Sequence, residues 1–379
     1  MSSKPTISFW EKEVFLKNID LIIIGSGIVG LTAAIEFNRL HPAKKIVILE
    51  RGSFPSGAST KNAGFACFGS LTELASDMEV IGDQKVFDLV DRRWRGLSVL
   101  KELVGTKSIE YENLGGYELF TNRDQNSYDS ALNLMPKVNA ELQKIIGKDT
   151  FQKADDRISL FKFKGIEHII FNQYEAQINT GKMISQLIAL ARESGIEIIN
   201  GVTVNHIEDV NTSVEIETTL GKIKCLQCLI ATNGFTKKLL PEIEVEPARA
   251  QVLITSPIPN LPFKGTFHYN EGYYYFRNVG DRVLFGGGRN LDLARETTTE
   301  MALSNLIQEK LEELLTQVIL PTNSFDIEQR WSGIMGVSKS KETISRQLSE
   351  NVSCAVRLGG MGVAIGSLIG QDAARSIKY

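Results

Sequence analysis

The chain of 379 residues carries 42 Lys and Arg against 45 Asp and Glu, so its formal net charge of −3 gives no electrostatic footprint for nucleic acid or for an anionic membrane. Apolar residues make up 42% and charged residues 23%, which excludes disorder, collagen and a disulfide scaffold and fits a globular protein of two or three domains. The N-terminus is polar and broken by charges, and only four cysteines occur. We therefore expect no signal peptide, no transmembrane segment and a reducing, cytoplasmic location.

Residues 19–50 predict one strand–helix–strand unit. Residues 19–24 form a β-branched apolar run, as a buried parallel strand requires, and residues 31–40 carry apolar side chains at helical spacing. Residues 46–49 predict the second strand, and a long loop rich in Gly and Ser follows over 53–70. Such a unit is typical of an α/β fold.

The rest of the chain alternates helical and strand-like segments. Helices are predicted over 71–104, over about 125–146 with Pro136 interrupting the pattern, over 181–194 and over 298–318. Strands are predicted at 115–121, 157–171, 196–199, 202–207, 214–218, 223–230 and within 248–290, and residues 356–379 predict a strand, a glycine-rich turn and a final helix. This order indicates a nucleotide-binding domain assembled from several pieces, with sheet-rich insertions between them.

Three glycines stand between the first predicted strand and helix, in the pattern Gly25-x-Gly27-x-x-Gly30. In a dinucleotide-binding unit Gly25 allows the tight turn, Gly27 lets the backbone approach a pyrophosphate, and Gly30 lets the helix pack closely on the strand. The N-terminus of that helix then attracts the phosphates. Glu50 follows the second strand, where an acidic residue accepts hydrogen bonds from ribose hydroxyls and argues against NADP.

Further segments complete a resemblance to a known family. They are residues 57–65, Ala231-Thr232-Asn233-Gly234 after an apolar strand, residues 274–287, and residue 331 to the C-terminus. With the glycine pattern and Glu50, the sequence resembles the FAD-dependent amino-acid and amine oxidases of the D-amino-acid oxidase superfamily, which includes glycine oxidase, sarcosine oxidase and γ-glutamylputrescine oxidase. The resemblance implies an α/β fold in which a Rossmann-like FAD-binding domain carries an inserted, sheet-rich α+β substrate domain. The first domain would comprise residues 1–80, 176–240 and 325–379, and the second residues 81–175 and 241–324.

The resemblance also implies which residues hold FAD, and neither Cys67 nor Cys354 matches a position of covalent attachment, so we expect non-covalent FAD. The hydroxyls of Ser59 and Thr60 would donate to phosphate, and the turn 359–362 before the final helix would face the electron-rich edge of the flavin. An NAD-only dehydrogenase would lack the segments 57–65 and 359–362. The expected cofactor-binding residues are Gly25, Gly27, Ile28, Gly30, Glu50, Arg51, Ser59, Thr60, Asn62, Ala63, Gly64, Val204, Thr232, Asn233, Gly234, Gly359, Gly360, Met361, Gly362 and Val363.

Four residues are candidates for the substrate pocket, and none is assigned as an acid or a base: Tyr274, Phe65, Met335 and Met361. Tyr274 falls where glycine oxidase has an active-site tyrosine. Because side chains alternate along a strand, Tyr273 and Tyr275 lie on the opposite face from Tyr274, and the sequence leaves open which face meets the flavin.

Two positions depart from the family pattern. Segment 331–336 resembles Trp-x-Gly-x-Arg-Pro, whose arginine pairs with the substrate carboxylate, but Met335 stands in its place and cannot form a bidentate ion pair. Met361 replaces a histidine of some relatives. These departures weigh against a simple α-amino acid held in the usual way and fit a non-carboxylate amine, as in the γ-glutamylputrescine branch. An anionic group could still reach one of four other arginines: Arg277, Arg289, Arg330 or Arg346.

The implied function is oxidation of a C–N bond in a small amine or amino acid by hydride transfer to flavin N5, after which the imine is hydrolysed. The electron acceptor would be oxygen, or a quinone or other carrier. Two alternatives stay open, namely an FAD-dependent hydroxy-acid dehydrogenase and a flavin-binding homologue without turnover. The lone CxxC pair, Cys225 and Cys228, is interpreted as part of a strand, and no metal site is predicted.

Overall fold

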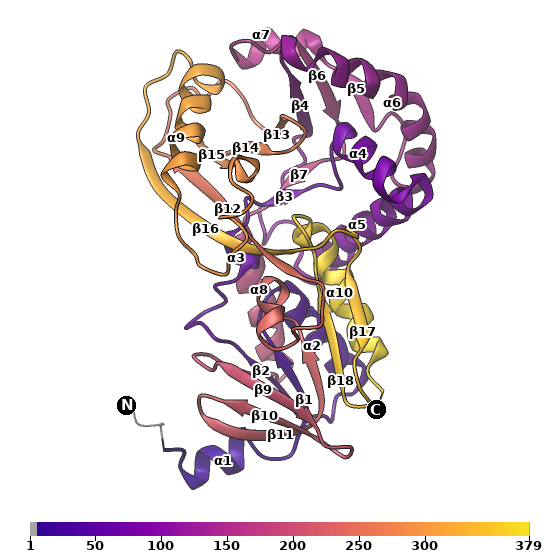
Figure 1. Cartoon of the computed structure of the whole chain (residues 1–379), viewed down its shortest axis with the longest axis vertical. Helices are drawn as coiled ribbons and strands as arrows, with labels where there is room; N and C mark the ends of the chain where they lie inside the picture. The colour runs from indigo at the N-terminus through magenta and orange to yellow at the C-terminus, as the bar shows by residue number, and fades with distance from the viewer. Residues whose placement is uncertain (1–5, 379) are drawn as a thin grey trace.

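Two large sheets organise the computed structural model, which describes residues 6–378 (Figure 1). The first sheet has the order β17-β18-β11-β1-β2-β8, and an antiparallel pair, β9 and β10, extends it from β11. Its strands are β1 (Ile19–Ile24), β2 (Ile46–Leu49), β8 (Glu197–Ile199), β9 (Val204–Asp209), β10 (Val214–Thr218), β11 (Gly221–Ile230), β17 (Ile344–Gln347) and β18 (Val352–Val356). Strand β1 pairs in parallel with both β2 and β11, which confirms the predicted strand–helix–strand unit.

Four helices pack on one face of this sheet and share a continuous apolar core with β1 and β2. They are α2 (Ile28–Leu40), α5 (Asp83–Val104), α8 (Thr180–Glu193) and α10 (Gly362–Ser376). Helices α10 and α2 cross so closely that a Cβ on Gly366 would lie 2.5 Å from Cγ2 of Ile28, and a Cβ on Gly370 would lie 2.0 Å from the Thr32 hydroxyl. Glycine at these positions therefore permits the C-terminal helix to dock against the first helix of the unit.

The second sheet has the order β16-β12-β15-β14-β13-β4-β6-β5 and occupies the upper part of Figure 1. Its strands are β4 (Gly116–Phe120), β5 (Phe151–Lys153), β6 (His168–Asn172), β12 (Glu246–Thr255), β13 (Thr266–Tyr269), β14 (Tyr274–Val279), β15 (Arg282–Gly287) and β16 (Ile327–Val337). Helices α4 (Leu71–Ile81), α6 (Gln125–Ile145) and α9 (Asn305–Leu314) flank it. Its core is rich in aromatic rings, among them Phe267 stacked on Phe276 at 4.7 Å.

Several predicted boundaries need correction. Strand β16 pairs along β12 of the second sheet, so the expected first-domain segment 325–379 rejoins the first sheet only at β17. Pro136 lies inside helix α6, which continues past it. The expected strand 157–171 begins instead with the short helix α7 (Ile158–Phe161), and the expected helix 298–318 begins at Asn305. Residues 1–5 and 379, which the expected first domain includes, lie outside the described residues.

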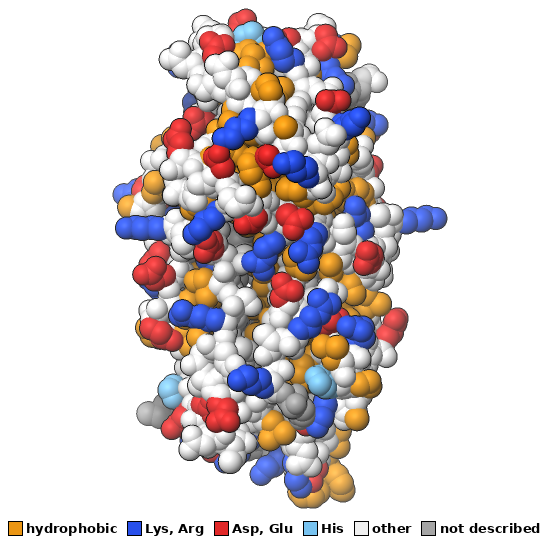
Figure 2. All heavy atoms as spheres, turned by 90° about the vertical axis from the view of Figure 1, so that its right-hand side faces the viewer, with side chains coloured by type: hydrophobic (Ala, Val, Ile, Leu, Met, Phe, Trp, Pro, Cys, Tyr) orange, Lys and Arg blue, Asp and Glu red, His pale blue; other side chains and the backbone are white. Residues whose placement is uncertain are grey.

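The smaller elements are helices α1 (Phe9–Phe15) and α3 (Ala58–Lys61) and a two-stranded sheet of β3 (Phe65–Ala66) and β7 (Ala176–Gln177). On the face shown in Figure 2, acidic and basic side chains are interspersed, as the near-zero net charge predicts. Among residues 6–378, no helix is both long enough and apolar enough to cross a membrane.

Candidate active site

One cavity of about 520 Å³ lies where the two sheets meet. Ile24 and Leu49, at the carboxyl ends of β1 and β2, line one part of it, and Val252 and Tyr275 from the second sheet line another. Its volume falls within the ~300–1,000 Å³ of small-molecule sites. The cavity also begins where ligands bind in open α/β sheets, beyond the carboxyl ends of parallel strands.

The glycine turn after β1 forms the wall of the cavity at the first sheet. Gly25 has a φ of +105°, which favours glycine, and a Cβ there would lie 2.8 Å from the Ala231 carbonyl oxygen. Gly30 does not line the cavity. It packs against the turn instead, since a Cβ on it would lie 1.9 Å from the Gly25 carbonyl oxygen. Gly27 is the N-cap of α2 and has no side chain to cap it. The N-terminus of this 13-residue helix therefore opens onto the cavity.

Glu50 follows β2 beside this turn and is held in place by hydrogen bonds. The backbone N–H and the hydroxyl of Ser26 donate to one carboxylate oxygen at 3.1 Å and 2.6 Å, and the Gly52 N–H donates to the other at 2.8 Å. The guanidinium of Arg51 lies over the Phe235 ring, 4.1 Å from its centroid. Glu50 and Arg51 both line the cavity.

Within the 57–65 loop, the hydroxyls have partners that the sequence did not predict. The Ser59 hydroxyl accepts from the Ile28 N–H at the start of α2, at 3.0 Å. The Thr60 hydroxyl donates to the Pro55 carbonyl oxygen at 2.8 Å, and Thr60 does not line the cavity. The expectation that Thr60 donates to phosphate is therefore corrected, because its hydroxyl closes the turn of its own loop.

The side chains of Asn62 and Arg277 hold the backbone of the 57–65 loop in place by hydrogen bonds. The Asn62 amide donates to the Ala58 carbonyl oxygen at 3.0 Å and its oxygen accepts from the Gly64 N–H at 2.8 Å. The buried guanidinium of Arg277 donates to the Ala63 and Ile178 carbonyl oxygens, and burial lowers the pKa of Arg277 to about 10. Arg277 is thus a structural partner of the loop.

The C-terminal turn reaches the same cavity from β18. Residues 359–363 line it, and the N-cap of the 15-residue helix α10, Met361, makes no side-chain cap. The Asn233 side-chain oxygen accepts from the Leu358 N–H at 3.2 Å, which links the segment 231–234 to this turn. Gly234 does not line the cavity, because its Cα packs against β16, where a Cβ would lie 2.4 Å from the Met335 carbonyl oxygen.

An aromatic wall closes the end of the cavity at the second sheet. The Phe65 ring meets the edges of Tyr275 and His268 at centroid distances of 5.7 Å and 5.4 Å. Burial raises the pKa of Tyr275 to about 12, so its phenol stays neutral at pH 7. Tyr274 is 3% exposed and packs with Phe285 in the core of the second sheet, so the expected pocket residue is corrected to its neighbours Tyr273 and Tyr275.

Most of the expected residues are brought together, and several others join them. The expected residues that line the cavity are Gly25, Gly27, Ile28, Glu50, Arg51, Ser59, Asn62, Ala63, Gly64, Phe65, Val204, Thr232, Asn233, Met335, Gly359, Gly360, Met361, Gly362 and Val363. The sequence reasoning missed Lys61, Glu73 and His268. The pattern Ser70-x-x-Glu73 is typical of a helix start, and the two residues form a capping box on α4. No local sequence pattern indicates that Glu73 lines a cavity.

The cysteines occupy different environments. Cys67 lines the cavity with its sulfur 3.8 Å from that of Met361, and burial raises the pKa of its thiol. Cys354 is buried within β18. Cys225 and Cys228 lie in β11, as the sequence predicts, and burial raises the pKa of Cys225 to about 12.

His268 forms a buried ion pair with Glu175 behind the aromatic wall. The two side chains approach to 2.7 Å between Nε2 and Oε1. Burial alone lowers the pKa of His268, but the charges of Glu175, Glu73 and Glu118 outweigh it and raise the pKa to about 9. The imidazole is therefore a cation at neutral pH, paired with Glu175.

This pair predicts a pH-dependent stability. Because the folded-state pKa of about 9 lies above the ordinary histidine pKa of 6.5, the stabilisation is complete below pH 6.5 and is lost as the pH rises through 9. We expect a contribution on the order of 3 kcal/mol. Thermal unfolding at several pH values should show the wild-type melting temperature falling more steeply between pH 6.5 and 9 than that of His268→Gln. Parallel curves for the two proteins would contradict the charged pair.

Comparison with known proteins places this geometry in a class. The two sheets over a shared cavity match L-proline dehydrogenase from P. horikoshii, with a TM-score of 0.75, 16% identity and coverage of 96% of this chain and 94% of that one. They also match glycine oxidase from Bacillus cereus, with a TM-score of 0.71, 20% identity and 95% coverage of both chains. These likenesses show that the chain shares the two-domain α/β fold of these two proteins.

The family follows from the sequence match. Residues 20–376 match the model of the family described as FAD dependent oxidoreductase, and the chain belongs to that family. It is also similar to a probable oxidoreductase, OrdL, of Rhizobium meliloti, with 24% identity over 370 residues that cover 94% of this chain and 82% of that protein.

The residues at the cavity fit the cofactor of this family. The N-termini of α2 and α10 both open onto one cavity, and neither N-cap residue makes a side-chain cap, although the Ser59 hydroxyl accepts from the Ile28 N–H of α2. Free backbone N–H groups at a helix start attract negative charge, as a pyrophosphate and a reduced flavin both carry. The fixed carboxylate of Glu50 offers acceptors beside the first of these helices.

Proposed function

We propose that the protein oxidises a C–N bond of a small amine or amino acid and that water then hydrolyses the imine. The observation that carries this proposal is one cavity that joins the glycine turn at the first sheet to an aromatic wall at the second. When bound, non-covalent FAD would accept a hydride at its N5 atom. Two proteins similar to this chain, a glycine oxidase and an N-methyl-L-tryptophan oxidase, are named for the oxidation of amino acids, which supports the choice of a C–N bond.

The residues around the glycine turn and the two helix starts would bind the polar and charged groups of the cofactor. The turn at Gly25 and Gly27 and the start of α2 would take the pyrophosphate, and Glu50 would accept from the ribose hydroxyls. The start of α10, at Gly362, would face the part of the flavin that gains negative charge on reduction. A helix N-terminus stabilises such charge by its dipole and its free N–H groups.

The pocket residues would orient the substrate and exclude water. Phe65 and Tyr275 present ring surfaces to the cavity, and the neutral Tyr275 hydroxyl can donate a hydrogen bond. Met335 and Met361 add apolar, polarisable surface at the same end. A substrate amine that binds in its neutral form needs no charged base, so no side chain is assigned that role.

The experiment that tests this proposal is an anaerobic titration of the purified protein, followed by its visible spectrum. We expect a flavin spectrum that one class of amine or amino acid bleaches, and acid precipitation should leave the yellow colour in solution because FAD is not covalently bound. Oxygen and a soluble quinone, added separately, would then identify the electron acceptor by which of them restores the spectrum.

Three other outcomes would overturn the proposal in different ways. Bleaching by hydroxy acids and by no amine would indicate oxidation of a C–O bond. A flavin spectrum that no compound bleaches would indicate a flavin-binding homologue without turnover. A protein that takes up no FAD would contradict the proposed C–N oxidation and both of these alternatives.

A further inference from the structure

The loop 288–304, which joins β15 to α9, carries exposed apolar side chains. Five large ones lie on this loop and the first turn of α9, each 38–50% exposed: Leu291, Leu293, Met301, Leu303 and Leu306. Single exposed apolar residues are normal on a protein surface and need no ligand. Leu293 differs from the other four because it also lines the cavity.

Tyr273 is a second exposed residue that lines the cavity, and it lies beside the start of this loop. It belongs to the turn between β13 and β14 and is 47% exposed. Its carbonyl oxygen accepts from the Gly288 N–H at 3.0 Å. Among the large apolar side chains that are exposed within residues 6–378, only Leu293 and Tyr273 line the cavity. We call these two residues the apolar rim.

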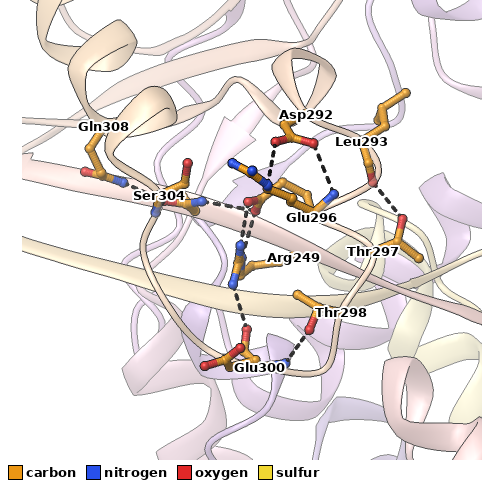
Figure 3. A network of polar contacts seen from close by, with 11 residues as sticks. Arg249, Asp292, Leu293, Glu296, Thr297, Thr298, Glu300, Ser304 and Gln308 are labelled. Atoms are coloured by element: carbon orange, nitrogen blue, oxygen red, sulfur yellow. Dashed lines mark hydrogen bonds and ion pairs between the residues drawn. The ribbon is translucent and has the colours of Figure 1, made fainter.

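Hydrogen bonds hold the backbone of Leu293 in a turn. The Thr297 hydroxyl donates to the Leu293 carbonyl oxygen at 2.8 Å (Figure 3). The Leu291 N–H donates to the Gly288 carbonyl oxygen at 3.1 Å, which keeps the start of the loop tightly coiled. Leu293 is therefore fixed close to the point where the loop leaves β15.

A buried ion pair anchors this turn to the second sheet. Glu296 accepts from Arg249 of β12 through two hydrogen bonds, at 2.8 Å and 2.6 Å (Figure 3), and from Gln251 at 3.0 Å. Side chains alternate along a strand, and Val252, the next residue of β12, lines the cavity. The loop thus runs from the cavity at Leu293 to the opposite face of β12, where the ion pair opposes any movement that would bury Leu293.

Exposed apolar surface that the fold holds in place can bind an apolar group. A ligand that covers it removes apolar area of both partners from water, which strengthens binding by roughly fourfold for each methylene buried. Because the turn is already fixed, little of this gain is lost to ordering the loop. Leu293 therefore offers a ligand in the cavity a preformed apolar contact.

We propose that the apolar rim binds an alkyl or aryl substituent of the substrate, so that the substrate is an amine with a bulky apolar group beyond its reacting carbon. This inference rests on the proposed function and adds the substrate class to it. The amine would lie toward the aromatic wall of Phe65 and Tyr275, and the substituent would cover Leu293 and Tyr273.

The test measures the binding of compounds that cannot be oxidised. tert-Butylamine and 2-aminoisobutyrate carry no hydrogen on the carbon beside nitrogen, so neither can pass a hydride to flavin. One alkyl chain of each is lengthened by one methylene at a time, and both series are titrated into the FAD-loaded protein, with the flavin spectrum and the melting temperature as readouts. We expect the affinity of the wild type to rise by roughly two- to fourfold for each added methylene in at least one series.

Substitutions at the rim should remove this dependence on chain length. Leu293→Ser should lower the gain to less than about twofold for each methylene and leave the affinity for the shortest member unchanged. Leu293→Met keeps the apolar surface and should keep the gain. Leu306→Ser is the matched control, because Leu306 is also 50% exposed but does not line the cavity, and it should bind every probe as the wild type does. If Leu293→Ser does not fold, Tyr273→Ser tests the other half of the rim with the same expectation.

Several results would overturn the proposal. One is a wild type that binds neither series, or whose affinity does not rise with chain length. Another is an equal gain for each methylene in the wild type and in the rim variants. Loss of bound FAD or a change of molecular mass in solution on Leu293→Ser would show that the cofactor or a second copy of the chain covers the leucine. Failure of the oxidation is a separate result, because no amine would bleach the flavin of a protein whose affinity still rises with chain length.

Discussion

Gly30→Ala is expected to destabilise the protein by about 3 kcal/mol or more and to abolish flavin uptake. The added Cβ would lie 1.9 Å from the Gly25 carbonyl oxygen and 3.3 Å from Cγ2 of Ile23. The first of these atoms belongs to the backbone, so no side-chain rotation relieves the overlap, and helix α2 must move away from β1. That movement would open the glycine turn and displace the helix N-terminus from the cavity. Melting temperature and the ratio of flavin to protein absorbance would measure the two effects.

Gly181→Ala serves as the control, because Gly181 also lies in the first turn of a helix on the same sheet. A Cβ there would meet only the Asn179 side-chain oxygen, at 3.4 Å, which is an ordinary contact. Alanine has the higher helix propensity, so this variant should be as stable as the wild type or slightly more stable, with full flavin content. A Gly30→Ala protein that behaves in the same way would show that α2 does not need the close approach.

Glu296→Ala is expected to cost about 3–5 kcal/mol. Glu296 has no exposed surface and Arg249 is 7% exposed, so the substitution would leave a buried guanidinium without its partner. It would also remove the acceptor of the Gln251 amide. Denaturant or thermal unfolding would measure the loss, and increased proteolysis within residues 288–304 would show whether the loop is released.

A double substitution separates the charge effect from simple loss of packing. Arg249→Met combined with Glu296→Leu removes both charges and fills similar space, so it should recover most of the stability lost by Glu296→Ala. Arg295→Ala, on the same loop but exposed, should change stability by less than about 0.5 kcal/mol. If the double variant were as unstable as Glu296→Ala, the loss would come from packing and not from an unpaired charge.

The sequence predicted what local patterns determine. The strand–helix–strand unit over 19–50 follows from apolar periodicity and three glycines at fixed spacing, and the structure confirms β1, α2 and β2. Glu50 could be placed at the end of the second strand for the same reason. The C-terminal turn and helix over 359–376 could also be predicted from a local pattern, since a glycine run before an apolar helical stretch marks a helix start.

Pairing between distant segments could not be predicted in this way. Alternation along β14 indicated two faces, but the choice of the face of Tyr275 over that of Tyr274 depends on which strands and helices cover each side of the sheet. The ion pair of His268 and Glu175 joins a residue of β13 to one in the turn between β6 and β7, 93 positions away, and no local spacing indicates it. Residues 327–337 were expected in the first domain, but they form β16, whose partner β12 in the second sheet is chosen by long-range packing.

The order in which the chain is synthesised has a consequence for assembly. The cavity takes walls from Gly25 near the start of the chain and from Gly362 near its end, and helix α10 docks on α2 across that interval. A growing chain can pair β1 with β2 early, but it cannot close the cavity until Gly362 and the rest of helix α10 have left the ribosome. At ~5–20 residues per second, the nascent protein spends tens of seconds with an incomplete first sheet. A ligand that needs both walls of this cavity can therefore bind only after α10 has docked on α2.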